Sequence, residues 1–157
     1  MLLVVHAGDA FGEPGARRAD GGGRRRGSSA GDLAVAEEIL APDMVFRGPS
    51  YMGEPIQGLE AFAQFVRYLR SAFPDMLFIV GHEVAEGDWV ATSFTLRGTH
   101  RGEYMGLGPT GKAIDLPGVD LFRVAGGRIR EVRVFYDTLG LMQQLGVAPT
   151  QQSAPSR

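Results

Sequence analysis

The sequence predicts an α+β fold in which helices cover one face of a curved antiparallel sheet. Four segments have strand character, and glycine-containing turns at 86–88 and 125–127 join them into two hairpins. These segments are residues 76–85, 89–97, 113–124 and 128–136. Ahead of them, "LEAFAQFVRYLRSAF" at 59–73 repeats apolar residues at helical spacing and ends at Pro74. Since this helix must bury its apolar stripe, we expect it to pack on the sheet.

Three shorter elements complete the expected order. "DLAVAEEIL" at 32–40 reads as a short helix that Asp32 caps, and residues 44–47 read as a short strand. After the last strand, "TLGLMQQLG" at 138–146 places Leu139, Met142 and Leu145 on one helical face. The order is therefore helix, strand, helix, two hairpins and a closing helix.

Composition excludes several kinds of function. A chain of 157 residues with 44% hydrophobic and 22% charged residues is typical of one globular domain. The net charge of −2 gives no sign of a nucleic-acid partner. The absence of cysteine excludes disulfides and thiol chemistry, and the three histidines are too widely spaced for a metal pair, so we expect no metal and no cofactor. No dinucleotide, phosphate-loop or G-x-S-x-G motif occurs.

The two ends of the chain differ from its middle. Residues 1–30 carry five arginines and a glycine triplet without apolar periodicity, so we expect them to be disordered, as a solvated tail rather than a polyanion-binding segment. Residues 148–157 read as a second disordered tail, which leaves 31–147 as the domain. No apolar run is long enough to span a membrane, and "MLLVV" is too short for a signal peptide, so the expected location is cytoplasmic.

Three motifs follow one another in an order typical of one family. They are "GTHRGEYMGLGPTGK" at 98–112, "FRVAGGRI" at 122–129 and "DTLGLMQQLG" at 137–146. Over residues 31–147 the chain resembles the SnoaL-like polyketide cyclases, or ester cyclases, of the nuclear-transport-factor-2-like superfamily. The resemblance implies a cone-shaped, cystatin-like roll that encloses one apolar pocket and forms homodimers through its sheet.

The resemblance also implies a reaction. Members of this family close a ring of an aromatic polyketide methyl ester by intramolecular aldol condensation, without metal or coenzyme. One carboxylate near the end of the last strand serves as acid and base, and Asp137 stands at the matching place. A carboxyl group can do both if an apolar pocket raises its pKa. We name His100, in "GTHRG", as the second candidate catalytic residue.

The residues themselves leave alternatives open. Asp137 shares a strand face with Glu131 and Arg133 and precedes a helix, so it can equally be an exposed N-cap. His100 can instead hydrogen-bond the backbone of its own loop. The candidate substrate-binding residues, which are alternatively core residues, are Phe94, Tyr104, Met105, Arg123 and Phe135.

Strand parity leaves one further choice open. Asp120 and Arg123 lie on opposite faces of their predicted strand, and parity does not say which of them faces the pocket or the dimer interface.

The chain departs from the family pattern in two places. Val132 and Arg133 stand where the family usually has His-Trp, and a glycine- and arginine-rich run occupies the place of a first amphipathic helix. We therefore hypothesise that residues 1–30 are not the native start of a working domain.

Rival functions follow from the same scaffold. They are a ketosteroid-isomerase-like proton shuttle, an epoxide hydrolase that uses an Asp-Arg-Asp network, and a non-catalytic binding or dimerisation module. An exposed Asp137 would favour the binding module.

Overall fold

In this computed structural model of the protein, the structure describes residues 38–148. The predicted tail at 1–30 lies outside the described residues, as does most of the helix expected at 32–40. Of the tail expected at 148–157, only Ala148 lies within them. In chain order the elements are β1 (Leu40–Arg47), a 3₁₀ turn η1 (Ser50–Met52), β2 (Ile56–Gln57), α3 (Leu59–Ala72), β3 (Leu77–Glu86), β4 (Trp89–Thr99), β5 (Ala113–Ala125), β6 (Arg128–Tyr136) and α4 (Thr138–Leu145).

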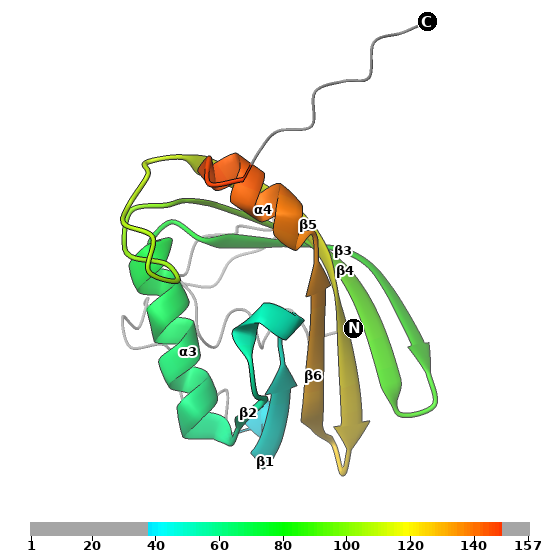
Figure 1. Ribbon diagram of the computed structural model, residues 1–157. Coiled ribbons are helices and arrows are strands. Elements are labelled where there is room, and N and C mark those ends of the chain that lie inside the picture. Colours follow the sequence, from blue (N-terminus) through cyan, green and yellow to red (C-terminus); the bar gives the residue numbers. More distant parts are fainter. Residues whose placement is uncertain (1–37, 149–157) are drawn as a thin grey trace, which may run out of the picture.

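One curved six-stranded sheet forms the body of the molecule, and α3 lies across its concave face (Figure 1). The strand order is β2-β1-β6-β5-β4-β3. The predicted α+β class, both hairpins and both described helices are confirmed, with bounds within about two residues of the expected ones. Both hairpin turns use glycine at positive φ, at Gly87 and at the Gly126-Gly127 pair.

The sheet is mixed rather than wholly antiparallel, because β1 pairs with β6 in parallel. This pairing sets Phe46 opposite Val132, so that both apolar side chains face α3. β1 also begins at Leu40, four residues before the expected strand, because Leu40 pairs with Ile129 and is buried there. The register shifts between Leu40 and Val45, a stretch that contains Pro42, which has no N–H to donate.

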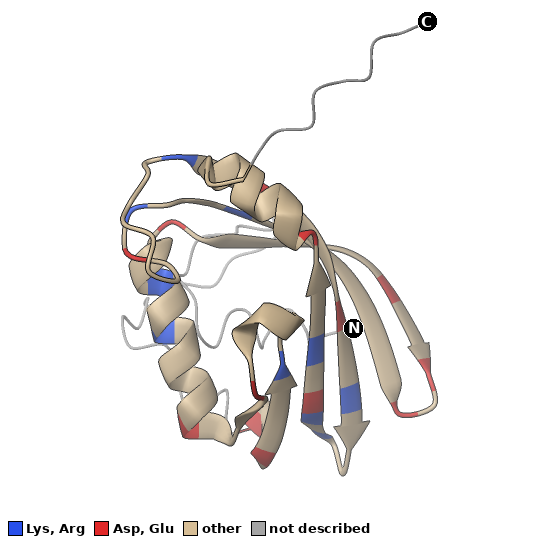
Figure 2. Ribbon diagram, in the orientation of Figure 1, with Lys and Arg blue, Asp and Glu red and all other residues tan. Residues whose placement is uncertain are grey.

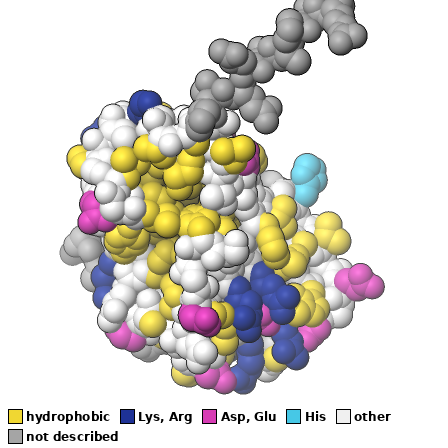
Figure 3. All heavy atoms as spheres, viewed as in Figure 1, with side chains coloured by type: hydrophobic (Ala, Val, Ile, Leu, Met, Phe, Trp, Pro, Cys, Tyr) yellow, Lys and Arg dark blue, Asp and Glu magenta, His cyan; other side chains and the backbone are white. Residues whose placement is uncertain are grey.

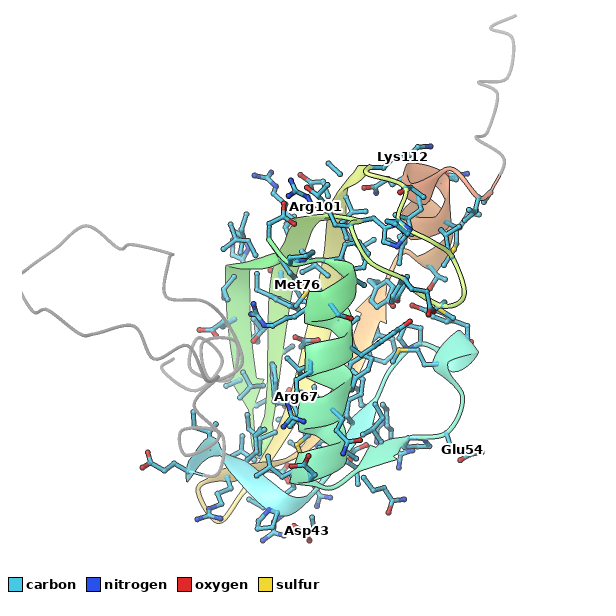
Figure 4. The ribbon with its side chains drawn as sticks, turned by 90° about the vertical axis from the view of Figure 1, so that its left-hand side faces the viewer. Asp43, Glu54, Arg67, Met76, Arg101 and Lys112 are labelled. Carbon is cyan, nitrogen blue, oxygen red and sulfur yellow. The ribbon has the colours of Figure 1, made fainter. Side chains whose placement is uncertain are left out.

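Two apolar clusters hold the layers together. The first joins α3 to the sheet: the Phe46 ring lies 5.3 Å from Phe62 and 5.1 Å from Phe65, between ring centroids. The second lies under α4 and the 100–112 loop and consists of Ala72, Phe73, Tyr104, Ile114, Leu116, Leu141 and Leu145. Figure 4 shows α3 in front of the sheet, with Met76 near its end and Arg101 and Lys112 at the end where the loop lies.

Within residues 38–148, no helix is long and apolar enough to cross a membrane.

Candidate functional site

Asp120 places a carboxyl group on the concave face of the sheet. On β5 it lies on the same face as Ile114, Leu116 and Phe122, which are buried in the core. Its nearest partners across the sheet are Thr92 on β4 and Val134 on β6. Burial in this setting raises the pKa of Asp120 to about 7. A carboxyl group with this pKa exchanges protons readily near neutral pH.

Asp120 belongs to a polar row that crosses three strands. Glu83 on β3 is opposite Thr92, and Thr92 is opposite Asp120. Among the described residues, each of these side chains has a buried oxygen without a hydrogen-bond partner, namely Oε1 of Glu83, Oγ1 of Thr92 and Oδ1 of Asp120. Unpaired buried oxygens are costly, so this row is the part of the concave face best suited to meet polar atoms of a ligand.

All four tyrosines of the chain form one cluster, and Tyr136 of this cluster lies on β6, the strand next to that of Asp120. The Tyr51 hydroxyl contacts the hydroxyls of Tyr104, at 3.1 Å, and of Tyr136. We call these three residues the tyrosine triad. Tyr68 on α3 stacks on Tyr104 and accepts a hydrogen bond from the backbone N–H of Met105, 2.6 Å away. Burial raises the pKa of Tyr104 and of Tyr136 above the ordinary range, so both hydroxyls stay protonated.

The tyrosine triad and Asp120 share the concave face. Tyr136 is opposite Gly118, two residues before Asp120 on β5. Figure 3 shows hydrophobic side chains, tyrosine included, gathered between α4 and η1 on the face viewed there. The structure thus brings a half-buried carboxyl group and a cluster of phenols together on one apolar surface.

His100 organises the loop that carries Tyr104. Its backbone N–H donates to Lys112 and its carbonyl accepts from Gly111, which closes the 100–112 loop. Its fully buried ring accepts the backbone N–H of Thr110 at Nδ1, 3.2 Å away. Its centroid lies 5.2 Å from that of Phe73. These contacts support the loop-organising alternative that the sequence left open for His100.

Two of the predicted substrate-binding residues lie on the concave side and three do not. Phe94 and Tyr104 are buried there. Met105 is half exposed at the tip of the loop, with a positive φ of 53°. Arg123 and Phe135 lie on the outer face of the sheet, where Arg123 forms an ion pair with Asp88. Strand parity explains the positions of Phe94 and Arg123, because even-numbered residues of β4 and β5 face α3 and odd-numbered residues face away. Phe135 faces outward with its partner Val119 on β5.

Asp137 occupies the N-cap of α4 and is exposed. Its Oδ1 accepts the backbone N–H of Gly140, 2.8 Å away, and its carbonyl accepts that of Leu141. It comes directly after β6 and continues the outward phase of Arg133 and Phe135, as the alternation predicted. The capping interpretation therefore describes its contacts, and the structure does not bring Asp137 to the concave face.

Sequence reasoning missed Asp120 as the candidate carboxylate. The sequence did indicate it by position, because Asp120 falls on the same strand face as Leu116 and Phe122 and is the charged residue on that apolar face. That signal was ambiguous because Val119 and Leu121 make the opposite phase of the strand apolar too. At the position of the family's usual His-Trp pair, Val132 lies in the core and Arg133 covers the ring of Trp89, 5.4 Å from its centroid. Among residues 38–148, no group of three or more metal-ligating side chains occurs.

Comparison with known proteins points to one family. Residues 25–145 match the family described as SnoaL-like polyketide cyclase. Aklanonic acid methyl ester cyclase DnrD of Streptomyces peucetius is 36% identical over 110 residues, which are 69% of this chain and 72% of that protein. Nogalonic acid methyl ester cyclase of Streptomyces nogalater is 32% identical over 112 residues, or 70% of this chain and 82% of its own.

Solved structures give the same result. A Jannaschia sp. CCS1 protein, assigned to the SnoaL-like polyketide cyclases, superposes with a TM-score of 0.69 at 30% identity, over 76% of this chain and 81% of its own. The fold and the relatives agree, and the chain belongs to the SnoaL-like polyketide cyclase family.

Proposed function

We propose that this protein is a polyketide ester cyclase that closes a ring by intramolecular aldol condensation in a hydrophobic, polycyclic methyl ester. The observation that carries the proposal is Asp120, a half-buried residue on the apolar concave face whose Oδ1 is buried without a hydrogen-bond partner and whose pKa is near neutrality. The relatives support it, since they are named as methyl ester cyclases of aklanonic and nogalonic acid. The proposed partner is therefore a hydrophobic small molecule.

Asp120 supplies the acid and the base of the reaction. Its carboxylate removes a proton from the carbon next to a ketone, and the resulting enolate carbon attacks a second carbonyl carbon in the same molecule. The new alkoxide then takes the proton back from the Asp120 carboxylic acid, which restores the carboxylate. The carboxyl group takes one proton and returns one proton, and between these two transfers one carbon–carbon bond forms, so a single carboxyl group is sufficient for the proton transfers.

The surroundings of Asp120 help the proton transfer in two ways. Phe94 and Phe122 keep the local medium apolar, which holds the pKa of the carboxyl group close to the working pH. The same apolar walls bind fused rings and fix the two reacting carbons near each other. Nearby, Thr92 offers a buried hydroxyl to a substrate oxygen or to the carboxyl group itself.

The experiment compares two carboxylates in turnover of aklanonic acid methyl ester. We expect Asp120→Asn to lower kcat by roughly 10²- to 10⁴-fold, the usual contribution of a general acid–base group. Asp137→Asn is the matched control, because asparagine also caps helices, and we expect wild-type turnover. Full activity in Asp120→Asn, or its loss in Asp137→Asn, would move the acid–base role away from Asp120. No turnover in the wild type with retained ligand binding would favour the binding module.

We also propose a homodimer formed through the outer face of the sheet. This face carries exposed apolar side chains on three strands, including Ile79, Val119 and Phe135, and they are 39%, 39% and 55% exposed. Exposed apolar side chains gathered on one sheet face are typical of a protein–protein interface. The expected cytoplasmic location stays a prediction, which cell fractionation would check.

A further inference from the structure

Thr92 is a buried residue whose hydroxyl group lacks a partner. Only 1% of the residue is exposed, and its Oγ1 is buried without a hydrogen bond to any described residue. A buried hydroxyl without a partner is costly, and valine would fill nearly the same space without that cost. Because the side chain has almost no opening to solvent, we look for its acceptor among the neighbouring side chains rather than in a ligand.

The residues directly opposite Thr92 both carry carboxyl groups. Asp120 is opposite it on β5 and Glu83 is opposite it on β3. Directly opposite side chains on one sheet face have Cβ atoms roughly 4.5–5.5 Å apart. The aspartate side chain is shorter than that of glutamate by a methylene group, so its oxygens lie nearer to the level of a threonine Oγ1 above the sheet. Asp120 is therefore the better placed acceptor.

The two oxygens of the Asp120 carboxyl group differ in their surroundings. Oδ1 is buried and has no hydrogen-bond partner among the described residues, whereas Oδ2 is not enclosed in this way and the residue as a whole is half-buried. On the other side of Asp120, the opposite residue on β6 is Val134, which offers no donor. Rotation of Thr92 about its Cα–Cβ bond moves the hydroxyl between staggered positions, so it can present its proton to Oδ1.

We propose that Thr92 is a positioning residue that donates a hydrogen bond to Oδ1 of the Asp120 carboxylate and leaves Oδ2 to face the substrate. The inference rests on the acid–base function proposed for Asp120 and adds how that carboxylate is held. A carboxylate fixed through one oxygen presents the other in a set orientation to the C–H bond that it cleaves. The hydrogen bond also favours the ionised form and so opposes the effect of burial.

Other titratable groups near Asp120 come from three elements. Glu83 lies two strands away on β3, and Tyr136 on β6 stays protonated because burial raises its pKa. On α3, Arg70 has a buried Nε. Burial is nevertheless the cause of the raised pKa of Asp120, without a contribution from a charged neighbour. A change in this pKa after removal of the Thr92 hydroxyl would therefore report the hydrogen bond.

The pKa of Asp120 tests the hydrogen bond without any substrate. In protein with ¹³C-labelled aspartate carboxyl groups, the Asp120 signal is assigned by its loss in Asp120→Asn and followed by NMR through a pH titration. We expect Thr92→Val to raise this pKa by about one pH unit, because the ionised form loses a donor. Thr92→Ser keeps the hydroxyl and should stay close to the wild type. An unchanged pKa in Thr92→Val, or an equal rise in Thr92→Ser, would overturn the inference.

Thr95→Val is the matched control. Thr95 lies on the same strand, but it is opposite Pro117 and points to the outer face. The same chemical change there should leave the pKa of Asp120 as it is. A rise as large as that in Thr92→Val would mean an indirect effect of the strand and would also contradict the inference.

The pH dependence of turnover separates this inference from the proposed function. With Asp120 as the base, kcat/KM for aklanonic acid methyl ester rises as Asp120 ionises, and Thr92→Val should move this rise to higher pH by the same amount as the pKa. A pKa that responds to Thr92 beside a pH–rate profile that does not respond would refute the acid–base role alone. A pKa that ignores Thr92, in a protein whose turnover is lost in Asp120→Asn, would refute the role of Thr92 alone.

Discussion

The raised pKa of the Asp120 carboxyl group should affect stability as well as catalysis. Its pKa in the folded protein is raised from 3.8 to about 7, with burial as the cause. Between these two values the unfolded chain has released the proton and the folded chain still holds it. Because the folded state binds more protons there, its stability falls as the pH rises from about 4 to 7 and is then constant. A gap of about three pH units amounts to a few kcal/mol, at ~1.4 kcal/mol per unit.

Replacing Asp120 by asparagine removes this loss, since the amide resembles the protonated acid in shape. We expect Asp120→Asn and wild type to have similar melting temperatures near pH 4, and the variant to melt higher above pH 7. Thermal unfolding followed by circular dichroism across this pH range is the measurement. If the melting temperatures of the two proteins differ by the same amount at every pH in this range, the Asp120 carboxyl group is solvated.

Gly118 is a second residue that shapes the site, because there is no room for a Cβ atom at this position. A Cβ atom added there would collide with the ring of Phe94 and lie 2.8 Å from the carbonyl oxygen of Phe135. The carbonyl belongs to a paired strand and cannot move aside, so the Phe94 ring must shift within the concave face. We expect Gly118→Ala to destabilise the protein by roughly 1–3 kcal/mol, the usual cost of overpacking.

Chemical denaturation measures that cost, and Gly108→Ala is its control. The structure leaves open space around Gly108, so an added methyl group meets nothing there. A Gly118→Ala protein as stable as Gly108→Ala would mean that Phe94 has room to turn.

At the scale of elements, regular strands and helices were predictable and pairing partners were not. The four long strands and α3 were found because each carries a clear period over nine or more residues. β2 has only two residues, and the first part of β1 exists because Leu40 pairs with Ile129, which lies far along the chain. The local sequence does not indicate which distant residues a strand will pair with. Asp120 was missed for a related reason, since both faces of β5 are apolar and the phase alone named no inner face.

The start of α4 gives a prediction at this scale. Asp137 accepts the backbone N–H of Gly140 and caps the helix. We expect Asp137→Ala to cost about 1 kcal/mol of stability, and Asp137→Ser, which keeps a capping oxygen, to cost much less. Denaturant unfolding of both variants gives the two values. Equal stability of the alanine and serine variants would show that the cap contributes nothing.

At the scale of the whole molecule, the two faces of the sheet serve different purposes. The concave face is covered by α3 and holds Asp120 and the tyrosine triad. On the outer face, arginines of β1 and β6 share Glu131, with Arg47 at 2.9 Å and Arg133 at 2.8 Å. Figure 2 shows the basic segments of β1, β5 and β6 side by side at the end of the sheet away from α4. Such exposed ion pairs contribute little to stability. We expect these charges to lie at the border of the interface.

The apolar part of the outer face should therefore control the oligomeric state. Val119 and Phe135 are direct partners on β5 and β6 and point away from the site, so a charge there disturbs association without touching Asp120. We expect wild type to sediment as a dimer and Phe135→Glu as a monomer in analytical ultracentrifugation at equal concentration. Val147→Glu places the same charge on an exposed apolar residue beyond α4 and should remain dimeric. If wild type sediments as a monomer, or if Phe135→Glu stays dimeric, the outer sheet face is not the interface.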